Sequence, residues 1–172
     1  MVSELIKLYG EEVKRVPGVA EIDGLWTLVV YDWDSIWIPV RDARERILNV
    51  KVRSMRESKD NRLQNSRYLW LSSSSYGGAS SGSTPHVPLW RRNSKSPYTT
   101  DVVRITEGEK KADIATTLSG ILTIAAPGVT NWQTLLPVLE ELKAKTVKIA
   151  FDSDARKNSS VAKALSGVVE AL

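Results

Sequence analysis

The chain has 172 residues, of which 42% are hydrophobic and 26% charged, a composition typical of a globular protein with one domain or two small lobes. No apolar run approaches the roughly 18 residues that span a membrane, and no signal-peptide pattern opens the chain, so we expect a cytoplasmic protein without membrane association. Because there is no cysteine and only one histidine, the chain excludes disulfides, zinc ribbons and cysteine nucleophiles.

The net charge is +4, but it is unevenly distributed along the chain. Residues 1–40 carry three basic and seven acidic residues, residues 41–100 carry twelve and four, and residues 101–172 carry nine of each. The middle segment therefore suits the binding of a polyanion such as nucleic acid. A solvated basic face that binds nothing is the alternative that composition leaves open.

The first elements expected are a helix and a hairpin. Apolar residues at helical spacing predict an amphipathic helix over residues 3–16, which Pro17-Gly18 ends. Two apolar runs, residues 25–31 and 36–40, flank a polar turn and predict two paired strands.

A basic strand is expected next. Apolar and basic residues alternate toward the end of segment 47–53, which places Lys51 and Arg53 on one face of a sheet. A further short strand, residues 67–71, contains Trp70, which is either a core residue or a surface on which bases stack. The Ser/Gly-rich residues 72–83 follow, and they are either a flexible linker or a loop that covers substrate.

Strands and helices alternate through the last part of the chain. We expect strands at 102–106, 121–125 and 147–151, and helices at 109–119, 131–143 and 158–171. Alternation of this kind implies right-handed βαβ units and a parallel sheet flanked by helices. The sequence thus predicts an α/β lobe over residues 99–172, preceded by a smaller, basic, mixed α+β lobe over residues 1–98.

Three acidic residues follow strands of the predicted α/β lobe. Glu107 ends one apolar run, and Asp152 and Asp154 follow another, two residues apart. Because ligands bind at the carboxyl ends of the strands in open α/β sheets, these carboxylates could converge there on a divalent cation, Mg²⁺ or Mn²⁺. The alternative for Asp152 and Asp154 is that they only cap the following helix.

These segments resemble the Toprim domain of bacterial primases, topoisomerases and some nucleases. The resemblance is carried by Ile-Thr-Glu-Gly at 105–108, by Ile-Ala-Ala-Pro-Gly at 124–128, and by Ala-Phe-Asp-Ser-Asp at 150–154. Segments 36–53 and 67–73 are similar to the basic subdomain that precedes Toprim in the primase catalytic core, and are closer still to primase-like proteins of phages and plasmids. The resemblance covers roughly residues 16–172.

The resemblance implies primer synthesis on a single-stranded DNA template from nucleoside triphosphates. Carried over by position, Glu107, Asp152 and Asp154 would hold the divalent ions, and Glu107 would assist deprotonation of the attacking 3′-hydroxyl. The residues that would bind template or nucleotide are Lys51, Arg53 and Arg67.

Other residues extend this predicted site. Lys110 and Lys111 stand near the start of helix 109–119, where they either reach phosphate or remain solvated. The family normally continues with another strand and further acids after the point where this sequence ends, so we expect either a piece of a longer protein or a minimal fold. A replicative helicase or further domains of a longer chain are the expected protein partners.

Two other functions remain open at this point. A Toprim nuclease would use the same acids to activate water and cleave nucleic acid. A nucleic-acid-binding fragment of a replication protein would bind through its basic residues without catalysis, and its binding would weaken steeply with salt.

Overall fold

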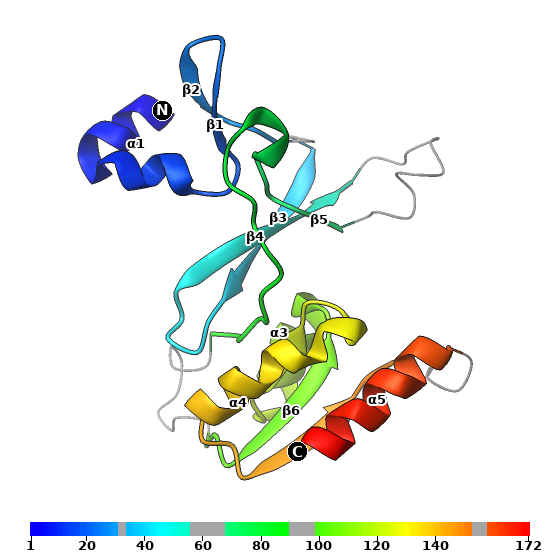
Figure 1. The fold of residues 1–172 in the computed structure, drawn as a ribbon. Coiled ribbons are helices and arrows are strands. Elements are labelled where there is room, and N and C mark those ends of the chain that lie inside the picture. The colour runs from blue at the N-terminus through cyan, green and yellow to red at the C-terminus, as the bar shows by residue number, and fades with distance from the viewer. Residues whose placement is uncertain (31–33, 56–67, 90–98, 153–157) are drawn as a thin grey trace. The chain divides into compact units, whose positions relative to one another are not determined.

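Two compact units make up the fold in the computed structural model (Figure 1). The residues that it describes are 1–30, 34–55, 68–89, 99–152 and 158–172. One unit contains Met1–Pro39 and Asn49–Gly82, and the other contains Val40–Leu48 and Ser83–Leu172. The lobe boundary expected near residue 98 lies outside the described residues and stays a prediction.

The first unit begins with two helical segments, α1 (Val2–Tyr9) and the 3-10 helix η1 (Glu11–Arg15). The prediction of one continuous helix over residues 3–16 is therefore wrong, because the helix is interrupted at Gly10. Gly10 has a φ of 81°, in the left-handed region that glycine adopts without the steric penalty of a side chain.

A short hairpin follows, in which β1 (Val19–Ile22) pairs antiparallel with β2 (Leu25–Leu28). Asp23 and Gly24 form its two-residue turn with φ of 51° and 75°, and an Asp-Gly pair with both φ positive is a preferred hairpin connection. The expected pairing of segment 25–31 with 36–40 is wrong, since β2 pairs with β1 instead.

A three-stranded sheet contains β3 (Ser35–Arg41), β4 (Ile47–Ser54) and β5 (Tyr68–Trp70), in the order β3-β4-β5. In the antiparallel β4–β5 pair, Lys51 lies opposite Trp70 and Arg53 lies opposite Tyr68. Seven of the twelve basic residues of segment 41–100 lie outside the described part of the chain, so the basic character of the N-terminal lobe stays a prediction.

The Ser/Gly-rich stretch after β5 is attached to the first unit. Ser73 is fully buried and donates a hydrogen bond from its hydroxyl to the carbonyl of Val19, at 2.7 Å. A Cβ on Gly78 would lie 2.5 Å from that same carbonyl oxygen, so only glycine allows this approach. The 3-10 helix η2 (Ser74–Tyr76) lies between these two residues.

The second unit contains a parallel sheet whose central strand is β6 (Val102–Glu107). Its neighbours are β7 (Thr123–Ala126) and β8 (Thr146–Ala150), in the order β7-β6-β8. Both pairs are parallel, which confirms the expected parallel sheet flanked by helices. The helical elements are α3 (Glu109–Ser119), η3 (Val129–Leu135), α4 (Leu136–Glu141) and α5 (Ser159–Ala171).

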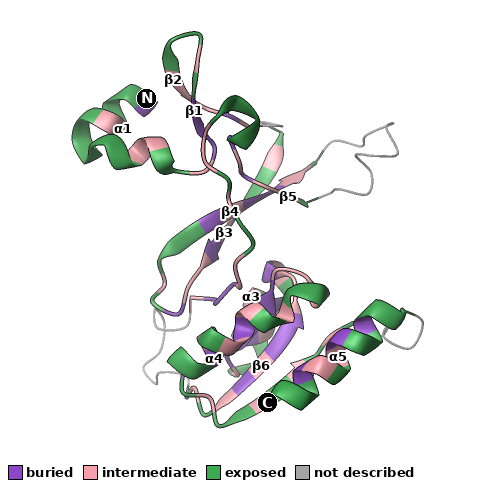
Figure 2. Ribbon diagram, viewed as in Figure 1, coloured by how far each residue is buried: buried purple, intermediate pink, exposed green. Residues whose placement is uncertain are grey.

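The helices cover both faces of this sheet, α3 on one and η3, α4 and α5 on the other (Figure 1). The faces covered by α3 and by η3 and α4 follow from right-handed crossovers that run in opposite directions from β6 to β7 and from β7 to β8, and α5 packs beside η3. The core lies between the layers, where Val103, Ile105, Leu122 and Ile124 are almost completely buried (Figure 2). The segment expected to be one helix over 131–143 is instead the 3-10 helix η3 followed by α4.

His86 connects three segments of the second unit. Its backbone forms two hydrogen bonds of 2.9 Å with Ala125 on the outer edge of β7. Its side chain is fully buried: Nδ1 accepts from the Arg41 backbone N–H at 3.2 Å, and Nε2 lies 3.1 Å from Oδ1 of Asp113. Because Nδ1 accepts, the neutral ring carries its proton on Nε2 and donates it to Asp113.

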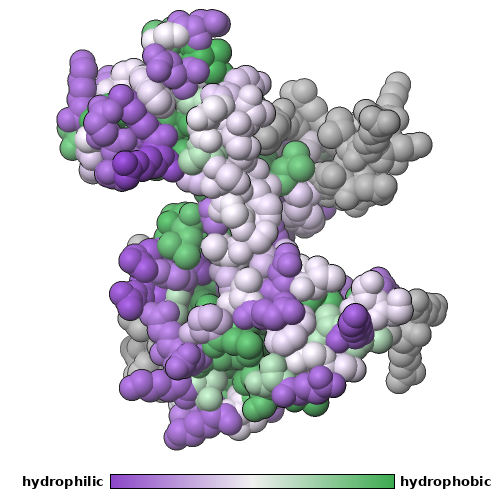
Figure 3. Space-filling model, in the orientation of Figure 1, coloured by the Kyte–Doolittle hydropathy of each residue, from purple (hydrophilic) through white to green (hydrophobic). Residues whose placement is uncertain are grey.

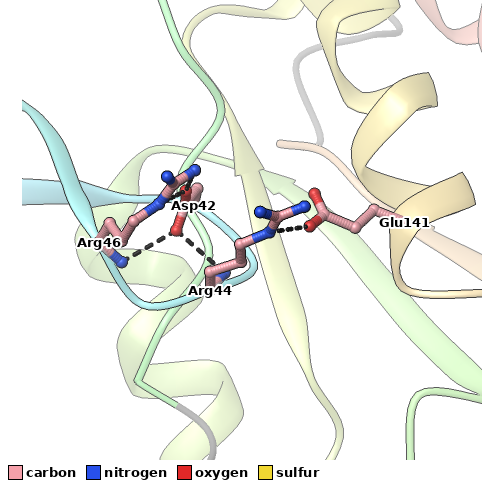
Figure 4. A network of polar contacts seen from close by, with 4 residues as sticks. All are labelled: Asp42, Arg44, Arg46 and Glu141. Carbon is pink, nitrogen blue, oxygen red and sulfur yellow. Dashed lines mark hydrogen bonds and ion pairs between the residues drawn. The ribbon is translucent and has the colours of Figure 1, made fainter.

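A polar network holds the turn between β3 and β4 (Figure 4). Oδ1 of Asp42 accepts from the backbone N–H groups of Arg44 and Arg46, both at 2.9 Å, and Oδ2 pairs with the Arg46 guanidinium at 2.7 Å. Partial burial raises the pKa of Asp42, but the hydrogen bonds and positive charge of Arg46 and the Arg44 N–H outweigh it, so the pKa lies below its usual 3.8. Arg44 also pairs with Glu141 at the end of α4, at 2.9 Å.

The surface of the second unit is mixed in character. Hydrophilic residues are interspersed with hydrophobic ones on its visible face (Figure 3). Apolar residues such as Leu118 and Val169 are well exposed, as single apolar residues often are on folded proteins. None of the described helices combines the length and the apolar character that crossing a bilayer requires.

Candidate functional site

Glu107 and Asp152, two of the three acids expected to meet, lie at the carboxyl ends of adjacent parallel strands. In the β6–β8 register Thr106 pairs with Ala150, so Glu107 and Asp152 follow at the same carboxyl edge of the sheet. The backbone N–H of Asp152 donates a hydrogen bond of 3.1 Å to Oε1 of Glu107. The Thr106 hydroxyl donates to the last carbonyl of β8, that of Ala150, at 2.9 Å. These two bonds hold the strand ends together.

Gly108 makes the turn from Glu107 into α3. Its φ is 79°, and a Cβ built there would meet no atom within 4 Å, so conformation rather than space favours glycine at this position. Glu109, in the first turn of α3, is only 3% exposed. Acids favour the first turn of a helix, and this one has its carboxylate buried against the unit.

Lys111 lies directly on the acidic edge. Its Nζ is 2.5 Å from both Oδ1 and Oδ2 of Asp152, and each side chain is about half exposed. The ammonium group thus contacts both carboxylate oxygens. The sequence left open whether Lys111 reaches phosphate or remains solvated, and in the structure it pairs with the acid. Lys110, the preceding residue of the same helix, is half-buried.

The third predicted acid, Asp154, lies outside the described residues. Within the described part of the chain, no three His, Cys, Asp or Glu residues are grouped closely enough to hold a metal ion. Glu107 and Asp152, at the same edge of the sheet, carry the carboxylate oxygens that Mg²⁺ and Mn²⁺ take as ligands, and the Asp152 carboxylate already pairs with one cation, the Lys111 ammonium. The residues therefore fit a divalent ion, with waters or phosphate oxygens completing its coordination.

Residues predicted to bind nucleic acid lie on the β4–β5 pair of the first unit. Nζ of Lys51 is 4.5 Å from the centre of the Trp70 ring, and Cζ of Arg53 is 5.6 Å from that of Tyr68. Both are cation–π contacts between residues directly opposite each other in the sheet. Lys51 is largely buried, at 9% exposure, whereas Tyr68 is exposed.

The sequence did not identify Tyr68 as part of this surface, because its place beside Arg53 depends on the strand register. The cluster Lys51, Arg53, Tyr68 and Trp70 alternates cations with aromatic rings on one face of the sheet. Arg67, also predicted to bind template or nucleotide, lies outside the described residues.

Comparison with known sequences gives one partial match. Residues 98–172 match the family model described as a domain of unknown function, DUF3854. No curated protein matches the chain.

Comparison with solved structures gives several matches along almost the whole chain. The zinc-binding and RNA polymerase domains of the Aquifex aeolicus primase match with a TM-score of 0.57 at 14% identity, over 97% of this chain and 38% of that one. A DNA primase domain from Pseudomonas aeruginosa gives 0.56 at 17% identity, over 94% and 50%. The DnaG primase catalytic domain bound to single-stranded DNA gives 0.58 at 15% identity, over 95% and 49%.

The chain spans half or less of the length of these primase structures. At such low identity the matches concern the fold, and they cover the first unit as well as the parallel sheet. The fold of this chain is therefore similar to that of bacterial primase catalytic domains.

Proposed function

We propose that this chain is a Toprim-type primase catalytic core, which joins nucleotides into primers on a single-stranded DNA template. The observation that carries the proposal is the meeting of Glu107 and Asp152 at one edge of the parallel sheet, in a fold similar to primase catalytic domains. In this proposal Asp154 joins them to hold Mg²⁺ or Mn²⁺.

The reaction forms a bond between the primer 3′-oxygen and the α-phosphorus of a nucleoside triphosphate, and breaks the bond from that phosphorus to pyrophosphate. Bound divalent ions supply stabilisation of the charge that develops on the attacking and leaving oxygens. Glu107 assists removal of the proton from the 3′-hydroxyl. Its Oε1 already accepts the Asp152 N–H, which fixes the orientation of the carboxylate.

Binding of the template is assigned to the cationic and aromatic face of β4 and β5. Lys51 and Arg53 meet phosphates, Trp70 provides a surface for base stacking, and Arg67 extends the set. A solved neighbour with the same fold is described as bound to single-stranded DNA, which supports this partner. Lys110 and Lys111 lie on α3, beside the acids, where triphosphate oxygens would be bound.

The nucleotides and the replicative helicase remain predicted partners. The origin in a phage, plasmid or other mobile-element replication system also rests on the sequence resemblance, as do the cytoplasmic location and the further domains of a longer chain.

The test is an incubation of single-stranded DNA with Mn²⁺ in two arms, one with labelled nucleoside triphosphates and one with end-labelled DNA and no nucleotides. We expect labelled primers in the first arm, intact DNA in the second, and loss of the primers in Asp152→Asn. Asp101→Asn is the matched control, because Asp101 also pairs with a lysine, Lys145, but stands at the opposite end of β6. It should retain activity.

Two results would contradict the proposal in different ways. Shortened DNA in Mn²⁺ without nucleotides would identify a nuclease that uses the same acids. Salt-sensitive DNA binding with no product under any metal would identify a binding module without catalysis.

A further inference from the structure

We propose that Lys111 is a built-in counter-ion that competes with the divalent metal for Asp152 and thereby sets the metal affinity of the site. This inference rests on the proposed function, since it assumes that Asp152 is a metal ligand. It gives Lys111 a role before metal binds, in addition to the contact with triphosphate oxygens proposed above.

The first support is the geometry of the contact. Nζ of Lys111 is within 2.5 Å of both carboxylate oxygens of Asp152, so the ammonium occupies the side of the carboxylate that a cation approaches. An ion that binds to these oxygens would stand next to a like charge, and the lysine must therefore withdraw as the ion enters.

The second support is the way in which Lys111 is held. Its helix α3 is anchored against the sheet by neighbouring residues that are buried, Glu109 at 3% and Ala112 at 0% exposure. The backbone of Lys111 is therefore fixed beside the acid, four residues after Glu107. Its side chain, in contrast, is 51% exposed and flexible, so it can leave the carboxylate for solvent.

The third support is the charge balance of the edge. The Glu107 carboxylate accepts the backbone N–H of Asp152, so both acids belong to the same edge of the sheet, and negative charges gathered at one edge repel each other unless a cation offsets them. Lys111 provides this offset before metal binds. Because an exposed ion pair is weak, a divalent ion can displace the lysine, and the competition lowers the apparent affinity without abolishing it.

The experiment is a titration of the full chain with Mn²⁺ at low ionic strength, in which electron paramagnetic resonance measures free Mn²⁺. We compare the wild type with Lys111→Met, Lys111→Gln, Lys111→Arg and Asp152→Asn. The matched control is Lys145→Met, which removes another lysine–aspartate pair of this sheet, at the opposite end of β6. Circular dichroism verifies that each variant is folded.

Both neutral variants should bind Mn²⁺ about threefold to tenfold more tightly than the wild type, because a competing and repelling charge has gone. Lys111→Arg should stay within about twofold of the wild type, since it keeps the charge. Lys145→Met should have no effect. Tight binding by Lys111→Met with none detectable in the wild type would also support the proposal.

Equal or weaker binding in both neutral variants would overturn the inference while leaving the metal site intact, provided that Asp152→Asn still loses Mn²⁺. If Asp152→Asn binds Mn²⁺ as the wild type does, or if neither the wild type nor Lys111→Met binds it, the proposed function and this inference both fail.

Discussion

Replacing His86 by alanine should destabilise the second unit strongly. The imidazole is fully buried, and its loss removes the acceptor of the Arg41 amide as well as the volume of a ring. An amide buried without a partner costs about 1–3 kcal/mol, and the cavity adds on the order of 2 kcal/mol. The other partner, Asp113, is 44% exposed and can bind water, so little is lost there. We expect a total loss of about 4 kcal/mol.

Urea unfolding followed by far-UV circular dichroism measures this loss. His86→Asn is the informative second variant, because the asparagine Oδ1 can accept from the Arg41 amide in place of Nδ1, and it should lose only about half as much stability. Asp113→Asn keeps an oxygen facing Nε2 and should cost less than about 1 kcal/mol. A loss below about 1 kcal/mol for His86→Ala, or equal losses for the alanine and asparagine variants, would refute the reasoning.

Three further predictions concern the turn, the DNA surface and the acidic edge. The lowered pKa of Asp42 means that its ionised form stabilises the fold above about pH 4 and that this contribution disappears as pH falls through the folded pKa. Asp42→Asn should therefore cost about 0.5–1 kcal/mol in urea melts at pH 7, and less below pH 3; an equal cost at both pH values would contradict this. Arg53→Met should weaken binding of single-stranded DNA in fluorescence anisotropy and reduce the slope of log affinity against log salt by about 0.7, whereas Lys163→Met on α5 should not. Glu107→Gln should slow nucleotide addition on the order of a hundredfold or more with the circular dichroism spectrum unchanged, and activity near the wild-type level would remove Glu107 from the mechanism.

The parallel sheet could be predicted from the sequence because its signals are local. Apolar runs separated by helical segments specify βαβ units, and the handedness rule then brings their carboxyl ends to one edge. The meeting of Glu107 and Asp152 follows from that topology alone. To predict that these two residues lie at one edge, it was enough to recognise the segments as strands, and no side-chain conformation had to be known.

The features that were missed depend on competition between signals or on distant contacts. The polar segment between residues 31 and 36 competes with Asp23-Gly24 as the turn of a hairpin. Choosing the longer segment led to the wrong pairing partner for β2, which pairs with β1. Glycine at position 10 divides a helix whose apolar spacing continues past it. The contacts of His86 with Arg41, Ala125 and Asp113 join segments far apart in the chain, and no periodic pattern reports them.

The ion pair between Lys111 and Asp152 also could not be predicted from the sequence. Lysines in the first turns of a helix are usually solvated, and only the packing of α3 in the structure brings this one to the residue that follows β8. In the same way, only the β4–β5 register shows that Arg53 lies opposite Tyr68.

The most direct test of the central claim is to locate a bound metal ion in crystals of the chain grown with Mn²⁺, by its anomalous scattering. Our proposal predicts an anomalous peak roughly 2.0–2.3 Å from carboxylate oxygens of Glu107 and Asp152, with the Lys111 ammonium moved away from Asp152. The assignment of these acids as the metal site would be contradicted if Glu107 and Asp152 were well ordered without an anomalous peak beside them. A peak only at other residues of the chain would contradict it as well.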